Sequence, residues 1–546
     1  MKYIFYLVFF SFHIAGAQKL KKADKVILAN LQTHINYLSD DKLEGRRTGS
    51  NGEKLAYEYI SSEFKKAGIA ARGDQDSYLQ VFEIYDGKEV APMSHLIING
   101  NDLKIHEEYF PMSFSPNASL ESTASIALQE NSNAWFYDLK ELVEGNKSNP
   151  HFDLEKAIRT KAGEAAKKGA NSFIIFNTST VKDELKFDPK ANNNDPLTIP
   201  VVYIGDAAKE KYLKDETATL DIKLKIVIAD KKRYGHNVIG YINNNAAYTI
   251  ILGAHYDHLG YGEDHNSLYT GNTPQIHNGA DDNASGTGAL IELGKMLKMG
   301  IHKNNNYLLI AFSGEELGLF GSKYFTEHPA TELGKVNYMI NMDMVGRLKD
   351  STRSLNIGGY GTSPVWSDLF LKKEKYFTIK LDSSGAGPSD HTSFYRKGIP
   401  VLFFFTGAHA DYHKPTDDAD KINFIGELQV IKFIYAVIEK MNIKGKLAFA
   451  KTRETQMNAR SSFNVTLGIM PDYVYAGPGV KVDGVTDGRI AQKAGIREGD
   501  IIIQLSDYNI TDMQAYIDTL NKFKKGDAAK VKVKRGGNEL IFDVVF

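Results

Sequence analysis

Continuous apolar strands that alternate with helical segments constrain this chain more than any other feature of its sequence. Four short apolar runs are the predicted strands: 248–254, 307–312, 336–342 and 400–405. Helical patterns separate them, and one of these places Leu290, Leu293 and Leu297 on a single face. Strands that are apolar along their whole length are typical of a sheet that helices cover on both faces. The sequence therefore predicts an α/β fold with a mostly parallel sheet.

The 546 residues leave room for about three domains. Residues 18–94 begin with a mainly helical stretch and residues 229–450 carry the strand–helix alternation, so we expect these two segments to form one split core. Between them, residues 95–228 contain short strands and an amphipathic helix, which predict an inserted α+β domain. After a polar tract, residues 460–546 predict a separate, β-rich domain.

Residues 1–17 predict a secretory signal peptide. Lys2 precedes an apolar run over 3–14, and the small residues 15–17 form a cleavage site. The apolar run is too short for a membrane-spanning helix, and no cysteine follows it that could carry a lipid anchor. We therefore expect an exported, periplasmic or secreted protein whose mature chain begins near Gln18 and has no membrane span.

The sequence contains no cysteine, which excludes disulfides, thiolate zinc sites, iron–sulfur clusters and a cysteine nucleophile. Any metal ion must therefore be held by His, Asp and Glu. The 66 Lys and Arg residues are balanced by 67 Asp and Glu residues, which gives a net charge of −1. Because there is no basic excess, we do not expect a nucleic-acid partner.

Imidazole and carboxylate side chains follow each predicted strand of the core. Five segments carry them: His255 to His258, Asp281 and Asp282, Glu315 and Glu316, Asp343, and Asp411 to His413. In open α/β sheets ligands bind outside the carboxyl ends of the strands. This donor set suits zinc, or alternatively cobalt or manganese.

Crowded carboxylates indicate two metal ions, because they would repel one another without cations. One carboxylate can bridge two ions at roughly 3.5–4 Å. A carboxylate that is not a ligand must then take the proton of the attacking water. The adjacent pair Glu315 and Glu316 can divide these two tasks.

Together these segments resemble the M28 family of dizinc peptidases, and they occur in that family's order. The resemblance includes the N-terminal motif Glu44–Gly49 and is carried by the following segments: 255–258, 279–286, 313–318, 341–344 and 412–413. It implies a zinc exopeptidase core and two zinc ions per chain. The implied activity is that of an exported aminopeptidase that releases N-terminal residues from peptides through a metal-bound hydroxide.

The resemblance also implies a role for each site residue. His255 and Asp343 would bind one zinc ion, Glu316 and His413 the other, and Asp282 both. Glu315 would be the general base, Asp257 would hold the ring of His255, and Tyr412 would donate a hydrogen bond to the developing oxyanion.

Nearby residues have weaker assignments. Asp281 is interpreted as a turn or cap residue. His258, His265 and His277 are interpreted as loop residues beside the site or as residues that support a ligand. His391, in the Ser389–His391 segment, is interpreted as structural or substrate-facing. No nucleophile elbow accompanies that segment, so a serine triad is not predicted.

Three other functions stay open at this point. The M28 family also contains carboxypeptidases and dipeptidases, so cleavage from the C-terminus of a peptide and cleavage of dipeptides stay open as alternatives. A single-zinc acyltransferase similar to glutaminyl cyclases would share the fold. A peptide-binding scaffold with an inert core is the third alternative, although no ligand or base position is empty.

Two further resemblances concern the other domains. Residues 95–228 resemble a protease-associated (PA) domain through 168–176 and 199–205, which implies either control of substrate access or packing alone. Residues 460–546 resemble a PDZ domain, with Thr466, Leu467, Gly468 and Ile469 as the carboxylate-binding loop. PDZ domains bind peptide ends as an added strand. We therefore expect peptide substrates and, at the PDZ domain, either a peptide or protein C-terminus or no ligand.

Overall fold

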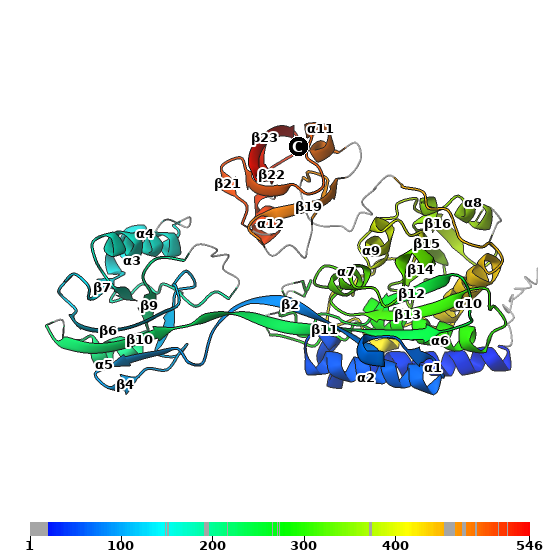
Figure 1. Cartoon of the computed structure of the whole chain (residues 1–546), viewed down its shortest axis with the longest axis horizontal. Helices are drawn as coiled ribbons and strands as arrows, with labels where there is room; N and C mark the ends of the chain where they lie inside the picture. Colours follow the sequence, from blue (N-terminus) through cyan, green and yellow to red (C-terminus); the bar gives the residue numbers. More distant parts are fainter. Residues whose placement is uncertain are drawn as a thin grey trace, which may run out of the picture. The chain divides into compact units, whose positions relative to one another are not determined.

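The computed structural model contains two compact units, and the chain passes from one to the other within strands β2 and β11 (Figure 1). The first unit contains the described parts of Met1–Phe82 and Gly235–Ala459, and the second contains those of Glu83–Tyr234 and Arg460–Phe546. The described residues are 20–147, 149, 152–189, 196–215, 217–264, 266–269, 271, 273–370, 374–452, 465–471, 477–485, 489–511, 513–520 and 522–546. The predicted signal peptide and His265 lie outside them.

A mixed sheet forms the centre of the first unit. Its order is β1 (Ala70–Ala71), β11 (Ile228–Ile242), β13 (Asn306–Phe312), β12 (Thr249–His255), β14 (Val336–Met342), β17 (Val401–Phe405), β15 (Ser354–Gly358) and β16 (Thr378–Leu381), and β2 (Leu79–Val90) pairs with β11. The four central strands β13, β12, β14 and β17 run parallel, whereas β11 and β15 join them antiparallel. Every residue of β12, β13 and β14 is buried. The predicted mostly parallel α/β fold is therefore confirmed.

Helices cover both faces of this sheet (Figure 1). The helices of the first unit are α1 (Lys22–Leu38), α2 (Asn51–Lys66), α6 (Gly286–Met299), α7 (Phe320–Glu327), α8 (Val365–Phe370), α9 (His391–Arg396) and α10 (Phe424–Met441). On one face, α1, α2, α6 and α10 pack in a single hydrophobic cluster with alternate strand residues such as Leu309. On the other face, Phe312 of β13 contacts Phe394 of α9, and Phe394 contacts Phe325 of α7.

The start of helix α2 is fixed by two reciprocal hydrogen bonds. Ser50 Oγ accepts a hydrogen bond from the backbone N–H of Glu53 at 3.2 Å, and Glu53 Oε2 accepts one from the N–H of Gly49 at 2.8 Å. This capping box satisfies backbone donors that a helix start leaves unpaired. A short 3-10 turn (Asp41–Arg46) precedes it. The motif Glu44–Gly49 thus begins in this turn and ends directly before Ser50, the N-cap of α2.

The second unit begins with two four-stranded sheets. One contains β4 (Asn101–Asp102), β3 (His95–Ile98), β10 (Thr219–Ile226) and β6 (Ala118–Ser125). The other contains β5 (Tyr109–Pro111), β9 (Val201–Ile204), β8 (Ser172–Phe176) and β7 (Ala134–Asp138). The helices here are α3 (Lys140–Asn146), α4 (Leu154–Lys167) and α5 (Asp206–Tyr212). The predicted strands around 172–176 and 199–204 are β8 and β9, while the PA-like assignment stays a prediction.

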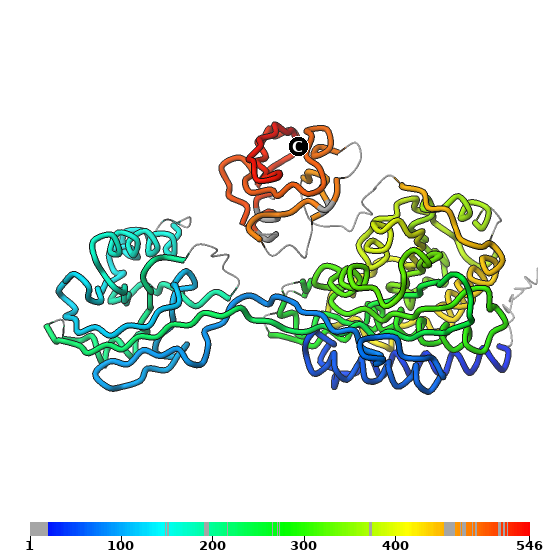
Figure 2. The backbone as a smooth tube through the Cα atoms, viewed as in Figure 1, coloured from blue at the N-terminus to red at the C-terminus, as the bar shows by residue number. Residues whose placement is uncertain are grey.

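The described residues of 465–546 form an antiparallel sheet with its own hydrophobic cluster. Their backbone is the orange-to-red part of the tube in Figure 2. The strands are β18 (Ile469–Pro471), β19 (Val480–Val485), β20 (Ile501–Leu505), β21 (Tyr508–Asn509), β22 (Ala528–Arg535) and β23 (Asn538–Val545), and the helices are α11 (Ile490–Ala494) and α12 (Met513–Leu520). Arg535 binds the buried carboxylate of Asp500 through two hydrogen bonds of 2.6 Å. Among the described residues, no helix has the length and hydropathy that a membrane span requires.

The core of the first unit allows a direct test of packing. Leu309 is fully buried in the middle of β13, so we expect Leu309→Ala to lower the free energy of unfolding by about 2–5 kcal/mol. Urea unfolding followed by the fluorescence of the buried Trp366, in a Trp135→Phe background, measures this unit alone. Met299, which is 80% exposed, is the control, and Met299→Ala should change stability by less than about 0.5 kcal/mol. Equal effects of the two substitutions would contradict the packing described.

Candidate metal centre

The predicted ligands gather at one edge of the sheet because their strands are parallel. His255 ends β12, Glu315 and Glu316 follow β13, and Asp343 follows β14. Parallel neighbours deliver their carboxyl ends to the same edge of a sheet, where the loops that follow them also meet. Asp282 lies in the turn before α6, and His413 lies in the loop after β17.

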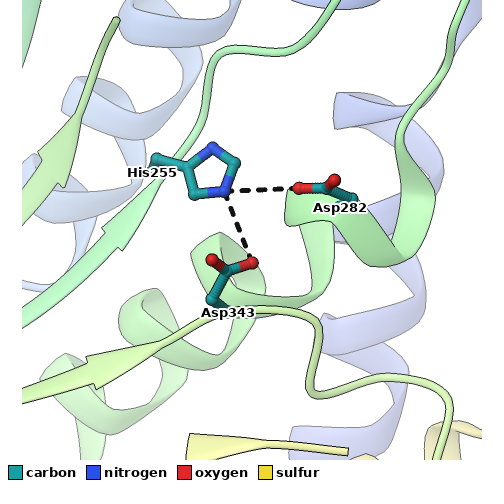
Figure 3. Close-up of side chains that lie close together, drawn as sticks. All are labelled: His255, Asp282 and Asp343. Atoms are coloured by element: carbon teal, nitrogen blue, oxygen red, sulfur yellow. Dashed lines mark ion pairs between the residues drawn. The ribbon is translucent and has the colours of Figure 1, made fainter. Parts of the chain in front are cut away.

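The first group of donors consists of His255, Asp282 and Asp343 (Figure 3). The Nε2 atom of His255 lies 3.3 Å from Asp282 Oδ1 and 3.4 Å from Asp343 Oδ1. One donor atom from each of the three residues lies within 4.8 Å of the others, which is close enough for a single ion. His255 is buried, so this ring is held in place by its surroundings.

The second group lies around Glu316 and contacts the first through Asp282. His413 Nε2 lies 3.2 Å from Glu316 Oε2 and 3.4 Å from Asp282 Oδ2. The two oxygens of Asp282 therefore face different imidazoles, Oδ1 towards His255 and Oδ2 towards His413. That is the arrangement expected of a carboxylate that can bridge two ions.

His258 contacts a predicted metal ligand. Its Nδ1 lies 2.7 Å from Glu316 Oε1, which agrees with the second of the two interpretations given for it, a residue that supports a ligand. His258, Asp282 and Glu316 also form a group whose donor atoms could share an ion. The ring of His258 is buried and meets that of His413 edge to face. His258 therefore either orients Glu316 or adds a nitrogen donor.

The charges of the site fit divalent cations. Four carboxylates, those of Asp282, Glu315, Glu316 and Asp343, surround the imidazoles of His255 and His413. Asp343 Oδ1 is buried and makes no hydrogen bond within the described part of the chain. Buried polar atoms without hydrogen bonds are rare and call for an explanation, and a bound cation supplies one. The donor set of nitrogen and oxygen atoms suits zinc.

The pKa values of the adjacent carboxylates Glu315 and Glu316 are shifted in opposite directions. Burial, with Asp343 and Glu316 adding to it, raises the pKa of Glu315 well above its usual range. Although burial opposes it, His413 lowers the pKa of Glu316 to about 2. Although burial also opposes it, Glu316 and Asp282 raise the pKa of His413 to about 11. Glu316 is therefore the better anionic ligand, and Glu315 the better proton acceptor.

Asp257 holds the loop of Glu315 more directly than it holds the ring of His255. Its Oδ1 accepts a hydrogen bond from the backbone N–H of Glu315 at 3.2 Å, and its Oδ2 accepts one from Thr48 Oγ1 at 3.0 Å. The Nδ1 atom of His255 lies 3.7 Å from Asp257 Oδ1 but 3.2 Å from the backbone carbonyl of Asp257. That carbonyl is the nearer partner of the ring.

Tyr412 lies directly against the second group. Its ring stacks on His413 with 3.9 Å between centroids. Burial, and then the charges of Asp282 and Glu316, raise the pKa of Tyr412 well above its usual value. The phenol therefore keeps its proton at neutral pH and can donate a hydrogen bond.

Asp281 and His277 make structural contacts beside the site. Asp281 Oδ1 accepts hydrogen bonds from Gly346 N at 2.7 Å and from Ser285 Oγ at 3.0 Å, which ties the start of α6 to the segment after β14. His277 Nε2 lies 2.7 Å from Ser267 Oγ.

The Ser389–His391 segment lies at the start of α9. Asn341 donates a hydrogen bond to Ser389 Oγ at 2.8 Å, and burial raises the pKa of Asp390 to about 7. His391 stacks on Phe403, and burial lowers the pKa of His391 to about 3. A neutral ring stacked on a core aromatic side chain favours the structural interpretation of His391.

Three buried polar residues near the site were not singled out from the sequence: Arg46, Thr48 and Glu53. The motif that contains the first two carries the family resemblance, but nothing in its residue types indicates their partners. Those partners are largely backbone atoms of distant segments, such as Tyr256 O for Arg46 and Gly314 N for Thr48.

The predicted PDZ loop precedes β18. Leu467 is buried, and its carbonyl accepts a hydrogen bond from the N–H of Ala491 at 2.8 Å. The N–H of Gly468 donates to Thr466 Oγ1 at 3.1 Å. The role of residues 466–469 as a carboxylate-binding loop stays a prediction.

Comparisons with curated proteins match the chain to aminopeptidases. Aminopeptidase YwaD of Bacillus subtilis (strain 168) is 28% identical over 322 residues, which are 57% of this chain and 65% of the relative. Leucine aminopeptidase 2 of Trichophyton rubrum is 26% identical over 412 residues, 71% of this chain and 74% of the relative. The chain spans just under two thirds of the length of YwaD.

Solved structures with a similar fold include the zinc aminopeptidase BSAP of Bacillus subtilis and the glutaminyl cyclase of Porphyromonas gingivalis. The first is 22% identical, covers 77% of this chain and 95% of its own, and has a TM-score of 0.41. The second is 13% identical, covers 77% and 98%, and has a TM-score of 0.39.

Family comparisons identify two domains. Peptidase family M28 matches residues 237–437, which contain all eight residues predicted for the site from His255 to His413. The PDZ domain family matches residues 456–545. The resemblances to both families seen in the sequence are thereby confirmed. The chain contains a metallopeptidase domain of family M28, followed by a PDZ domain.

Proposed function

We propose that this protein is an exported, zinc-dependent exopeptidase that removes N-terminal residues from peptides. The observation that carries the proposal is the pair of donor groups that share Asp282, one with His255 and Asp343 and the other with Glu316 and His413. The relatives named as aminopeptidases support the cleavage of N-terminal residues. The predicted signal peptide supports export.

Each ion would have its own imidazole and carboxylate, and Asp282 would bind both. Zinc in these positions supplies polarisation of the scissile carbonyl and a lowered pKa for the attacking water. His255 and Asp343 would hold the first ion, and Glu316 and His413 the second. Asp282 supports this division because its two oxygens face the two groups separately.

Proton transfer would fall to Glu315. Its carboxylate lies 4.0 Å from His255 Nε2, at the edge of the first group, and the N–H of Glu315 is held by Asp257. Its raised pKa suits a group that accepts a proton from the attacking water and gives it to the leaving amine. Tyr412, which stays protonated, would donate its O–H to the developing oxyanion.

The PDZ domain would bind a peptide or a protein C-terminus beside β18. The short strand β18 begins at Ile469, directly after Thr466, Leu467 and Gly468. An extended peptide could pair with a sheet edge there, as PDZ ligands do. Binding at this domain is separate from the hydrolysis proposed for the M28 domain.

Removal of the general base is the first test. We expect Glu315→Gln to lower kcat by about 100-fold or more, because the proton of the water then has no acceptor, while the zinc content is unchanged. Steady-state kinetics and metal analysis of the same preparation measure both. Glu332→Gln, at an exposed position on the same unit, is the control and should keep full activity. A near-normal rate for Glu315→Gln would show that another group is the base.

The number of zinc ions is the second test. We expect two ions per chain in the wild type and about one in His413→Ala, because the second ion loses its imidazole. Mass spectrometry of metal content after dialysis measures this. His277→Ala changes a nearby histidine that bonds to Ser267 and should leave two ions bound. One ion in the wild type would instead favour an acyltransferase similar to glutaminyl cyclases.

The end of the peptide that is cleaved is the third test. The enzyme should distinguish peptides with a free amine from their N-acetylated counterparts. Only the free-amine peptides should be shortened from the N-terminus. Mass spectrometry of the products identifies the residue released, and a chelator should abolish its release. Shortening from the C-terminus, or of acetylated peptides, would contradict the aminopeptidase proposal.

A further inference from the structure

Arg46 is a buried guanidinium that binds backbone carbonyls instead of a carboxylate. Its side chain is fully buried. Nε donates to Tyr256 O at 2.7 Å, Nη1 donates to Asn278 O at 2.7 Å and also to Leu38 O, and Nη2 donates to Gly279 O at 3.0 Å. One rigid, planar side chain therefore fixes four carbonyl groups.

Three of these carbonyls belong to the segments that deliver His255 and Asp282, and the fourth, that of Leu38, lies at the end of α1. Tyr256 directly follows His255, and Gly279 lies three residues before Asp282. Arg46 thus links the end of β12 to the turn that begins α6. A shift of either segment by a fraction of an ångström would change the distance between His255 and Asp282.

The backbone around Arg46 binds the same region. The N–H of Gly260 donates to Gly45 O at 3.1 Å, and the N–H of His258 donates to Arg46 O at 3.3 Å. Gly45 has φ +68°, and a Cβ atom there would lie 2.6 Å from His277 O. Only glycine allows this close approach. The 45–46 backbone is therefore built to contact the loop that follows His255.

The next residues extend the contacts to the segment of Glu315. Thr48 Oγ1 donates to Asp257 Oδ2 at 3.0 Å and accepts from the N–H of Gly314 at 3.1 Å. Glu53 accepts a hydrogen bond from Ser313 Oγ at 2.6 Å. One short N-terminal segment, residues 45–53, thus binds three of the segments that carry the site residues.

We propose that Arg46 is a positioning residue of the metal centre, which sets the separation of His255 and Asp282 through the carbonyls of Tyr256, Asn278 and Gly279. This inference rests on the zinc-binding function proposed above. Arg46 itself touches neither substrate nor ion. It acts through the backbone, as residues that orient metal ligands commonly do.

Charge and geometry predict opposite results when Arg46 is replaced, which makes the inference testable. A positive charge beside the site disfavours a bound cation, so a neutral replacement would strengthen zinc binding if charge were the only effect of Arg46. If positioning is its main effect, a neutral replacement weakens zinc binding. Arg46→Met removes the charge and the hydrogen bonds but keeps a long apolar side chain.

The experiment measures zinc affinity by competition with a chelator and, separately, urea unfolding of the metal-free full-length protein. We expect Arg46→Met to lower zinc affinity by about 10–100-fold. Arg46→Lys keeps the charge and fewer hydrogen bonds, so its affinity should lie between that of Arg46→Met and that of the wild type. If Arg46→Met does not fold, the loss of zinc affinity in Arg46→Lys still tests the inference.

Glu292→Gln is the matched control for a loss of stability alone. Glu292 is buried on α6 and bonds to Asn30, His34 and Lys295, away from the segments that deliver the donors. It should destabilise the metal-free protein while zinc affinity changes by less than about twofold. Unchanged or tighter zinc binding by both Arg46 variants would overturn the positioning role. Failure of the wild type to bind zinc would instead overturn the proposed function.

Discussion

The carboxylate of Asp282 is the interaction on which the rest of the site depends. Its Oδ1 faces His255 and its Oδ2 faces His413, which are the first and the last of the predicted metal ligands along the chain. Four carboxylates in such a small volume repel one another unless positive charge lies between them or some of them hold protons. The parallel strands deliver the groups to one edge, and the turn before α6 places Asp282 between them. The fold therefore determines how the charged groups of the site are arranged.

Glu315 and Glu316 show how the surroundings of a side chain decide its role. They are neighbours in sequence and both carry a carboxylate. Glu316 faces two imidazoles, those of His413 and His258, and against the effect of burial they keep its pKa low. For Glu315, burial raises the pKa, and the negative charges of Asp343 and Glu316 raise it further. Two identical groups thereby have different affinities for a proton, as in other sites with paired carboxylates.

Much of the fold and the position of the site could be predicted because both follow from local patterns. The apolar runs match β12, β13, β14 and β17 within two residues, and parallel strand ends bring their loops together. The contacts of Arg46 could not be predicted, because a backbone carbonyl has no signature in the sequence. For His258 the sequence indicates a place beside the site, but not its partner Glu316, because that contact depends on how two loops fold back. No strand was predicted for β15 or β16, which lie beyond β17.

The boundary between the two units has a consequence for how the first one folds. The chain leaves this unit after Phe82 and returns at Gly235, and these two residues are in contact, since a Cβ atom on Gly235 would lie 2.4 Å from Phe82 Cζ. The paired strands β2 and β11 thus hold the two ends of a long excursion together. The entropic cost of closing a loop depends only weakly on its length, so a long excursion whose ends adjoin costs little more than a short one. A short turn that joins Phe82 directly to Gly235 in place of the excursion should therefore leave the topology of the core intact.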